Sequence, residues 1–214
     1  MLYLLLLETA LGATWTVNAS GGSDFVYIQN AINASSDGDR IEVSAGTYAE
    51  ALDLGGKDLD IVGVDGAAST TITPPSGEVG VTFDQGEAGI FEGFTIVPSS
   101  ARAFHLETAS PVITDIEIQG GGVLGTIDGG AVYVSGGAPS FDTIDISSSE
   151  GRKGGAFYLV DQAIVSVSNV SVDSSSATWG GAFYVDDVNL SLDTVELVDI
   201  SASKSGGAFY VDDA

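Results

Sequence analysis

The stretch Gly129-Gly-Ala-Val-Tyr-Val134 returns three times along the chain with almost unchanged letters. The copies follow one another at offsets of 25, 26 and 26 residues. A unit of that length cannot bury its apolar side alone, so neighbouring units stack and share one long core. The repeat therefore predicts a solenoid in which each unit is one coil. The copies are Gly154-Gly-Ala-Phe-Tyr-Leu159, Gly180-Gly-Ala-Phe-Tyr-Val185 and Gly206-Gly-Ala-Phe-Tyr-Val211.

A second repeat, out of phase with the first, indicates what each coil contains. It consists of an apolar residue, two spacers, an apolar residue, one spacer and a third apolar residue. Apolar residues two positions apart lie on one face of a strand, and a two-residue spacer is typical of a bend. Three short parallel strands per coil predict a parallel β-helix of about seven coils. The five copies are Phe91/Phe94/Ile96, Ile113/Ile116/Ile118, Phe141/Ile144/Ile146, Val167/Val170/Val172 and Leu192/Val195/Leu197.

The spacers of this second repeat favour the same interpretation. Most of them contain Asp or Asn, which tolerate the left-handed backbone that tight bends need. We therefore expect each spacer to turn the chain between two strands. The spacers that contain Asp or Asn are Thr114-Asp115, Asp142-Thr143, Ser168-Asn169 and Asp193-Thr194.

The composition limits the class of protein. The chain has 214 residues, of which 44% are hydrophobic, with 29 glycines and no cysteine. This indicates one solenoid domain over residues 14–214, stabilised by its stacked core and not by disulfides. Six basic residues against 30 acidic ones give a net charge of −24. Such a charge repels nucleic acid and anionic membranes, so we expect no nucleic-acid partner.

Residues 1–13 have the pattern of a secretory signal peptide. The apolar run Leu4-Leu-Leu-Leu7 is followed by small residues, with a cleavage point expected near Gly12 or Ala13. Glu8 follows the run directly and no basic residue precedes it, which leaves an incorrect start or a buried first strand as the alternatives. No other segment approaches the roughly 20 apolar residues of a membrane-spanning helix.

The two ends of the solenoid carry different expectations. Residues 24–35 predict a short helix that Asp24 can cap and that covers the first coil. Such a lid protects strand edges that otherwise invite aggregation. The sequence stops directly after a repeat strand, at Val211-Asp-Asp-Ala214, so we expect the natural protein to continue. The apolar stripe of the helix is formed by Phe25, Ile28, Ala31 and Ile32.

The N-terminal part resembles the corresponding portion of pectin-lyase-like right-handed β-helix proteins. The resemblance rests on residues 24–50, which end in Gly46-Thr-Tyr-Ala-Glu50, and on Leu59-Asp-Ile-Val-Gly-Val-Asp-Gly66. In that superfamily the segment forms a capping helix, a strand, a Gly-Thr-Tyr turn and the next strand. The resemblance implies a right-handed, single-stranded parallel β-helix with a short N-terminal capping helix. The superfamily includes esterases, lyases and non-enzymatic surface proteins, so it does not choose a function.

The Gly-Gly units of residues 129–211 are similar to the repeats of bacterial polymorphic outer membrane proteins and related adhesin-like passenger domains. Those repeats pair the Gly-Gly motif with an aromatic-x-x-Asn element. Here Val172-Asp-Ser-Ser175 and Val198-Asp-Ile-Ser201 carry Ser in place of Asn. This second resemblance implies a secreted or cell-surface, outer-membrane-associated protein of bacterial type.

One tyrosine of each Gly-Gly unit is expected to point outward. The residues on either side of it, such as Phe157 and Leu159, are expected to point inward, while the preceding alanine shares the outward side. Coils about 4.8 Å apart would align the tyrosines into a ladder. Such a ladder either binds a sugar or a partner, or only stabilises the stacked strands. Its members are Tyr133, Tyr158, Tyr184 and Tyr210.

Aspartates follow the same strands. Carboxylates repeated at single-coil spacing repel one another, and a hard cation such as calcium would relieve that repulsion. Calcium is the only cofactor that the sequence suggests, and the alternative is that these are solvated turn residues. The aspartates are Asp161, Asp187 and Asp213, with Asp186 and Asp212 beside them.

An enzyme of this superfamily would also need a set of catalytic residues. By the resemblance, a pectate lyase calls for an arginine base near calcium-binding acids, and an esterase for two aspartates and an arginine on neighbouring coils. None of Arg40, Arg102 and Arg152 lies in a stretch that matches either motif. Arg102 and His105 can share a cleft with Glu107, although a lone histidine more often has a structural role. We therefore assign no catalytic residue.

These observations favour a secreted or cell-surface, non-catalytic repeat protein, adhesin-like, that binds a glycan or a protein partner along its lateral face. The alternatives are a carbohydrate-active enzyme, of polysaccharide lyase or pectin-esterase type, and a rigid spacer. An enzyme predicts a cleft where Arg102 or Arg152 meets two carboxylates, whereas a binding module predicts a regular lateral surface with stacked tyrosines.

Overall fold

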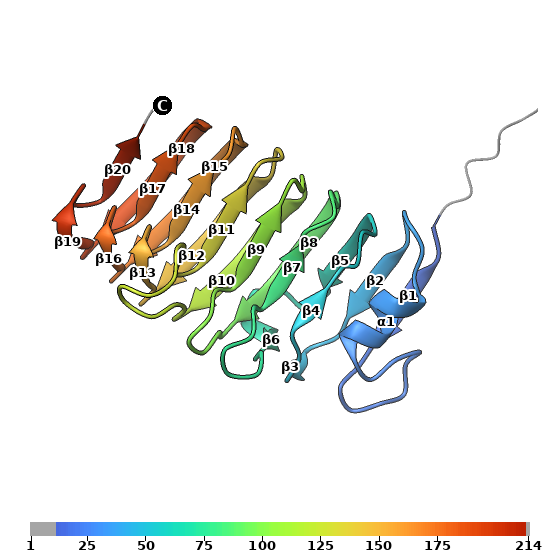
Figure 1. Cartoon of the computed structure of the whole chain (residues 1–214). Helices are drawn as coiled ribbons and strands as arrows, with labels where there is room; N and C mark the ends of the chain where they lie inside the picture. Colours follow the sequence, from blue (N-terminus) through green and yellow to red (C-terminus); the bar gives the residue numbers. More distant parts are fainter. Residues whose placement is uncertain (1–11, 213–214) are drawn as a thin grey trace, which may run out of the picture.

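The computed structural model describes residues 12–212, which form one β-solenoid of parallel strands (Figure 1). The right-handed parallel β-helix that the repeats predict is confirmed. The main path of the largest sheet contains eight strands, so the solenoid has about eight coils, one more than expected. The predicted signal peptide lies almost entirely outside the described residues, as does Asp213.

The strands form three sheets that run along the solenoid axis. Sheet A contains β1 (Thr14–Val17), β2 (Arg40–Val43), β3 (Gly46–Tyr48), β5 (Leu59–Gly63), β6 (Thr70–Ile72), β8 (Gly89–Ile96), β10 (Val112–Gln119), β12 (Ser140–Ser147), β15 (Ile164–Asp173) and β18 (Asn189–Val198). Sheet B contains β4 (Leu52–Asp53), β7 (Val81–Phe83), β9 (Phe104–Glu107), β11 (Val132–Ser135), β14 (Phe157–Val160), β17 (Phe183–Asp186) and β20 (Phe209–Asp212). Sheet C contains β13 (Glu150–Lys153), β16 (Ser176–Trp179) and β19 (Ser201–Ser205).

The core is a stack of apolar side chains from successive coils. Phe157 and Phe183 are fully buried and lie parallel, with ring centroids 4.8 Å apart, and Phe209 continues the stack at 4.8 Å. The predicted inward face of the Gly-Gly strands is therefore confirmed. The alanines expected to face outward are instead fully buried in three coils, because each precedes its strand and belongs to the turn. They are Ala131, Ala156 and Ala182.

The spacers bend the long strands of sheet A as predicted. The second spacer residue adopts left-handed backbone, with φ of 50° at Asp115 and 51° at Asn169. Thr143 and Thr194 take the same conformation despite their β-branched side chains. The bend lies inside one continuous strand, since the backbone ladder resumes directly after each spacer.

The Gly-Gly motif is explained by backbone crowding between coils. Gly154 has φ of +64°, and a Cβ there would lie 1.9 Å from the carbonyl oxygen of Phe157. At Gly155 a Cβ would lie 2.4 Å from the hydroxyl of Ser175. That buried hydroxyl donates to the carbonyl of Gly181 and also pairs with Ser149 of the previous coil. Serine at this position therefore ties the Gly-Gly turn of its own coil to the previous coil through buried hydrogen bonds.

The capping helix α1 (Ile28–Ala34) is shorter than predicted and is not capped by Asp24. Its first N–H groups, at Ile28 and Gln29, donate to the two carboxylate oxygens of Glu50 at 2.9 and 3.0 Å. Asp24 instead accepts hydrogen bonds from the backbone and hydroxyl of Thr16. The cap is thus supplied from the first coil, by the last residue of the Gly46–Glu50 segment.

Candidate functional site

The predicted tyrosine ladder lies on the outer face of sheet B. Parallel pairing places Tyr133 beside Tyr158, Tyr158 beside Tyr184 and Tyr184 beside Tyr210. The same register places His105 of β9 beside Tyr133, and their rings stack at 4.8 Å. We call these five residues the aromatic column: His105, Tyr133, Tyr158, Tyr184 and Tyr210.

The rings of the aromatic column mostly cover one another's faces. Centroid separations of the three tyrosine pairs are 5.3, 5.2 and 5.0 Å, with interplanar angles of 30°, 27° and 7°. Tyr184 is only 3% exposed. A sugar ring therefore cannot stack on the inner rungs, and the column presents ring edges and hydroxyls to a ligand.

A second column lies along the aromatic column, one residue before each Gly-Gly turn. Pairing between coils aligns Asp128 with Lys153, Lys153 with Trp179 and Trp179 with Ser205. We call Asp128, Lys153, Trp179 and Ser205 the flanking column. The ammonium of Lys153 lies 4.4 Å from the ring centre of Tyr184, so the two columns are in contact. Together with Arg102 and Lys204 they form what we call the strip.

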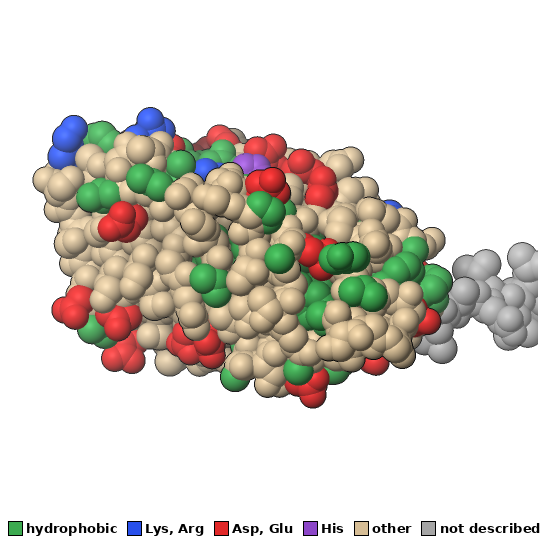
Figure 2. All heavy atoms as spheres, turned by 90° about the horizontal axis from the view of Figure 1, so that it is seen from below, with side chains coloured by type: hydrophobic (Ala, Val, Ile, Leu, Met, Phe, Trp, Pro, Cys, Tyr) green, Lys and Arg blue, Asp and Glu red, His purple; other side chains and the backbone are tan. Residues whose placement is uncertain are grey.

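Cations cover aromatic rings at three places on the strip. The guanidinium of Arg102 lies 4.7 Å from the ring centre of Tyr133, and Lys153 covers Tyr184. Lys204 lies 4.5 Å from the ring centre of Trp179. Figure 2 shows basic side chains and the histidine along one edge of a molecule that is otherwise rich in acids. The strip therefore combines the aromatic rings of the outer face with positive charge.

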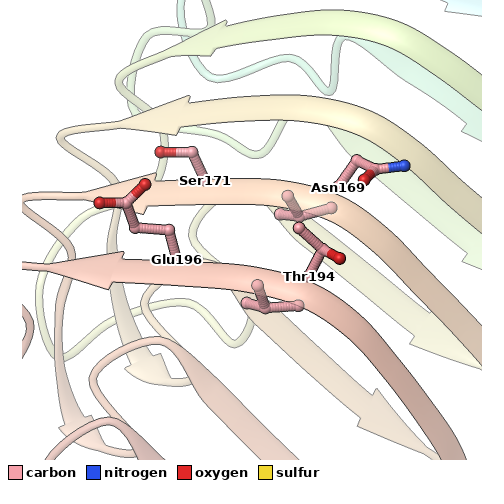
Figure 3. Close-up of a pocket in the computed structure, with 6 residues that line it drawn as sticks. Asn169, Ser171, Thr194 and Glu196 are labelled. Atoms are coloured by element: carbon pink, nitrogen blue, oxygen red, sulfur yellow. The ribbon is translucent and has the colours of Figure 1, made fainter.

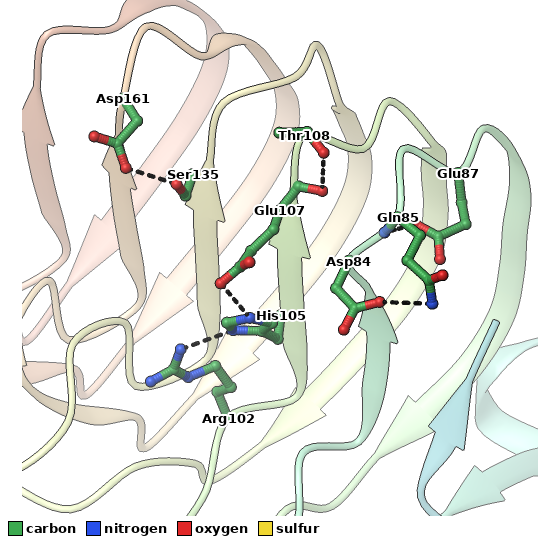
Figure 4. A network of polar contacts seen from close by, with 9 residues as sticks. All are labelled: Asp84, Gln85, Glu87, Arg102, His105, Glu107, Thr108, Ser135 and Asp161. Carbon is green, nitrogen blue, oxygen red and sulfur yellow. Dashed lines mark hydrogen bonds and ion pairs between the residues drawn. The ribbon is translucent and has the colours of Figure 1, made fainter. Parts of the chain in front are cut away.

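Arg102, His105 and Glu107 form a chain of polar contacts at one end of the strip (Figure 4). Arg102 Nη1 lies 3.1 Å from His105 Nδ1, and His105 Nε2 lies 3.1 Å from Glu107 Oε1. Since a guanidinium only donates, Nδ1 accepts and Nε2–H donates to the carboxylate. Burial, and then the charge of Arg102, lower the pKa of His105 below its ordinary value. The imidazole is therefore neutral at pH 7, with both nitrogens engaged.

A pocket of about 310 Å³ opens beside this chain and is lined by Arg102, His105 and Ile127, among others. One carboxylate, that of Glu107, contacts the histidine directly. On the neighbouring coil, Figure 4 shows Asp84 and Glu87 turned toward Gln85. Arg152 pairs with Asp128 at the flanking column. Neither Arg102 nor Arg152 is hydrogen-bonded to two carboxylates among residues 12–212.

Two of the predicted calcium ligands, Asp161 and Asp187, occupy turns. Asp161 and Asp187 have φ of 61° and 52°, a conformation that favours aspartate without any metal. Asp161 also accepts a hydrogen bond from Ser135 at 2.6 Å (Figure 4). Asp186 and Asp212 end their strands, and no group of three or more metal-ligating side chains converges among residues 12–212. Calcium binding by this set stays a prediction.

A shallow groove lies on sheet A where the strands bend (Figure 3). It measures about 360 Å³ and is lined by Asn169, Ser171, Thr194 and Glu196 together with two valines. The left-handed residues Asn169 and Thr194 create the concavity, since they turn both strands at the same level. It contains neither an aromatic ring nor a cation, so it lacks the chemistry of the strip.

Sequence reasoning found the tyrosines and singled out Arg102 and His105, but it did not place these two beside the tyrosines and did not align Lys153, Trp179 or Lys204 with them. His105 could have been aligned with the tyrosines, because Phe104-His-Leu-Glu107 has the alternation of Val132-Tyr-Val-Ser135. Lys153 and Trp179 could have been aligned by their place before Gly-Gly. Lys204 could not, because an irregularity in the pairing of β16 with β19 shifts it by one residue.

Comparisons with known proteins support the fold. No protein-family profile and no curated protein matches the sequence. Among solved structures, a pectin methylesterase in complex with a hexasaccharide matches with a TM-score of 0.57 and 15% identity, over 84% of this chain and 66% of that one. The chain thus spans just under two thirds of that structure and shares its parallel β-helix fold.

Two further pectin methylesterases have lower TM-scores. The enzyme from Aspergillus niger matches with a TM-score of 0.48 and 11% identity, over 94% of this chain and 90% of that one. The enzyme from carrot matches with a TM-score of 0.47 and 14% identity, over 95% of this chain and 89% of that one. Within the described part of the chain, no helix has the length and apolar character to span a membrane.

Proposed function

We propose that this protein recognises a polysaccharide along the strip, which extends over sheets B and C. The observation that carries the proposal is the placement of positive charge. The chain has only six basic residues, yet Arg102, Arg152, Lys153 and Lys204 all lie on or beside the strip. Ring edges, hydroxyls and cations together provide the mixture of apolar and hydrogen-bonding contacts that sugar binding uses.

The shape of the strip suits an extended chain. Five rungs at a strand spacing of about 4.8 Å give a length of about 19 Å. The contacts repeat from coil to coil, as do the residues of a polysaccharide. Because the rungs cover one another, we expect sugar residues to lie over their exposed edges and against Trp179, which is partly exposed.

The solved structures of the same fold support a carbohydrate ligand over a protein partner. They are pectin methylesterases, and one of them was solved with a hexasaccharide. Their likeness fits a carbohydrate-directed protein better than the adhesin-like role expected from the Gly-Gly repeats. Secretion and surface attachment remain proposals that rest on the sequence alone.

A second candidate function is ester hydrolysis on the same polysaccharide. It is favoured by the pocket beside Arg102, His105 and Glu107. The neutral His105 would act as a general base only after its Nδ1 atom no longer accepts the hydrogen bond from Arg102. Binding requires no such rearrangement, and for this reason we place it first.

Both candidates are tested by one assay. The protein is incubated with immobilised plant and bacterial polysaccharides, and bound protein and released methanol or carboxylate are measured in the same wells. Trp179→Ala should weaken binding at least about tenfold, because an aromatic anchor at a binding surface contributes about 2 kcal/mol or more. The control is Ile164→Ala, which removes an exposed side chain from β15 of sheet A.

The outcomes separate the candidates. Equal loss in the two variants, or no binding to any polysaccharide, would overturn the proposal. Product release that is abolished by Glu107→Gln would place hydrolysis above simple recognition.

A further inference from the structure

Two of the three lysines have neither an ion pair nor a side-chain hydrogen bond within residues 12–212. Arg40 pairs with Glu42, and Arg152 pairs with Asp128. Lys57 donates to carbonyl groups at the end of α1. Lys153 and Lys204 make no ion pair or side-chain hydrogen bond with any of residues 12–212, although the chain carries 30 acids.

Both lysines lie over aromatic rings that line one pocket. The pocket measures about 250 Å³ and is lined by Lys153, Trp179, Tyr184 and Tyr210. Lys153 lies 4.4 Å from the ring centre of Tyr184, and Lys204 lies 4.5 Å from that of Trp179. A ring face attracts an ammonium but accepts its hydrogen bonds only weakly, so N–H donors remain for a ligand.

The placement of Lys204 depends on a local irregularity. In β16 one residue separates Ala177 from Trp179, whereas in β19 two residues separate their partners Ala202 and Ser205. Lys204 belongs to the longer segment. Bulges re-aim side chains and are frequent beside functional sites. The extra residue therefore brings the ammonium of Lys204 to Trp179, whose coil lies between those of Lys153 and Lys204.

We propose that this pocket binds the anionic group of a sugar residue, a carboxylate or a sulfate. The inference rests on the proposed function and specifies its ligand. Two ammonium groups, from the coils on either side of that of Trp179, offer donors to the oxygens of such a group, while Trp179 and the Tyr210 ring edge contact the sugar. The net charge of −24 repels polyanions elsewhere, so binding is restricted to this end of the strip.

Calorimetric titration with three oligosaccharides of equal length tests the proposal: one neutral, one carboxylated and one sulfated. The variants are Lys153→Met and Lys204→Met, which keep an apolar side chain of similar length. Arg40→Met is the matched control, since it removes one positive charge from an exposed ion pair on β2. We expect the wild type to bind an anionic oligosaccharide at least about tenfold tighter than the neutral one, as for a charged hydrogen bond.

In each lysine variant, the preference for the anionic oligosaccharide should fall about tenfold. In Arg40→Met it should fall less than about twofold, because exposed ion pairs contribute little. The carboxylated and sulfated oligosaccharides show which anion is preferred, and tighter binding of either one supports the site. Equal affinity for neutral and anionic oligosaccharides, or an equal effect of Arg40→Met, would overturn the anion site and leave the proposed function intact. Failure of all three ligands to bind would overturn both.

Discussion

Gly181 and Gly207 occupy the same position of the repeat in neighbouring coils, but their surroundings differ. A Cβ on Gly181 would lie 2.4 Å from the carbonyl oxygen of Gly207 and 2.5 Å from that of Ser201. On Gly207 it would meet no described atom within 4 Å. The second glycine of the motif is therefore required by the coil that stacks on it.

Gly181→Ala should lower the free energy of unfolding by about 1–3 kcal/mol, the usual cost of overpacking against atoms that cannot move. In the 214-residue chain, Gly207→Ala should leave it unchanged or raise it by up to about 1 kcal/mol, since alanine reduces the entropy of the unfolded chain. Urea denaturation of both variants measures the difference. Equal midpoints would contradict the role of coil stacking.

His105 gives the protein a defined pH dependence. Its pKa is lowered in the folded state, so the fold prefers the neutral imidazole. Stability linked to this group is present above the unfolded pKa of about 6.5 and is lost as the pH falls from there through the folded pKa. When the pH is lowered from 7.5 to about 5, the free energy of unfolding should fall less in His105→Gln than in the wild type. A larger loss in the variant would show that the folded protein favours the charged imidazole.

At the scale of elements, the aromatic column predicts one tyrosine that resists ionisation. Burial, together with Asp128 and the neighbouring tyrosines, raises the pKa of Tyr158 to about 12. The neutral phenol is favoured by the fold, so stability linked to it is full below pH 10 and is lost as the pH rises through about 12. Alkaline difference spectroscopy should show this late step in the wild type and not in Tyr158→Phe. If Tyr158→Phe instead lost an ionisation step near pH 10, the raised pKa of Tyr158 would be contradicted.

The elements that the sequence predicted are those with an apolar pattern. Sheets A and B follow from alternation, and the bends follow from the two-residue spacers, although the left-handed residue is Asp115 or Asn169 in two of them and a threonine in two others. Sheet C was not predicted, because Glu150-Gly-Arg-Lys153 and Ser201-Ala-Ser-Lys-Ser205 have no apolar alternation. These strands are held by backbone pairing with adjacent coils. The helix cap was assigned to Asp24 because Glu50 is distant in sequence and is brought close only by the fold.

The candidate site shows the same division. The tyrosines lie in the repeated motif, so their column was predictable from spacing. The positions of Arg102, Lys153 and Lys204 over rings depend on side-chain direction and on the irregular pairing of β19, neither of which has a signal in the sequence. The sequence also did not indicate that the tyrosines of the ladder stack so closely that they cover one another's ring faces.

At the scale of the whole molecule, a net charge of −24 makes stability depend on ionic strength. Sodium chloride should raise the melting temperature by several degrees between low and physiological ionic strength, because it screens repulsion among the acids. The turn geometry accounts for Asp161 and Asp187, so calcium should raise it no more than magnesium at matched ionic strength. A larger shift with calcium that is lost in Asp187→Asn would instead establish the predicted metal site.

The two tryptophans permit a direct test of the strip. Trp15 lies in β1 beside Phe25, near the capping helix, and Trp179 lies in β16 near the other end of the solenoid (Figure 1). Trp15→Phe leaves Trp179 as the single tryptophan reporter, and Trp179→Phe leaves only Trp15, which is distant from the strip. Polysaccharide fragments that bind by calorimetry are titrated into both variants.

The account predicts that ligand changes the emission of Trp179 and protects it from a soluble quencher, while the emission of Trp15 stays constant. A ligand that binds by calorimetry without affecting Trp179, or that affects only Trp15, would show that the strip is not where the polysaccharide is held.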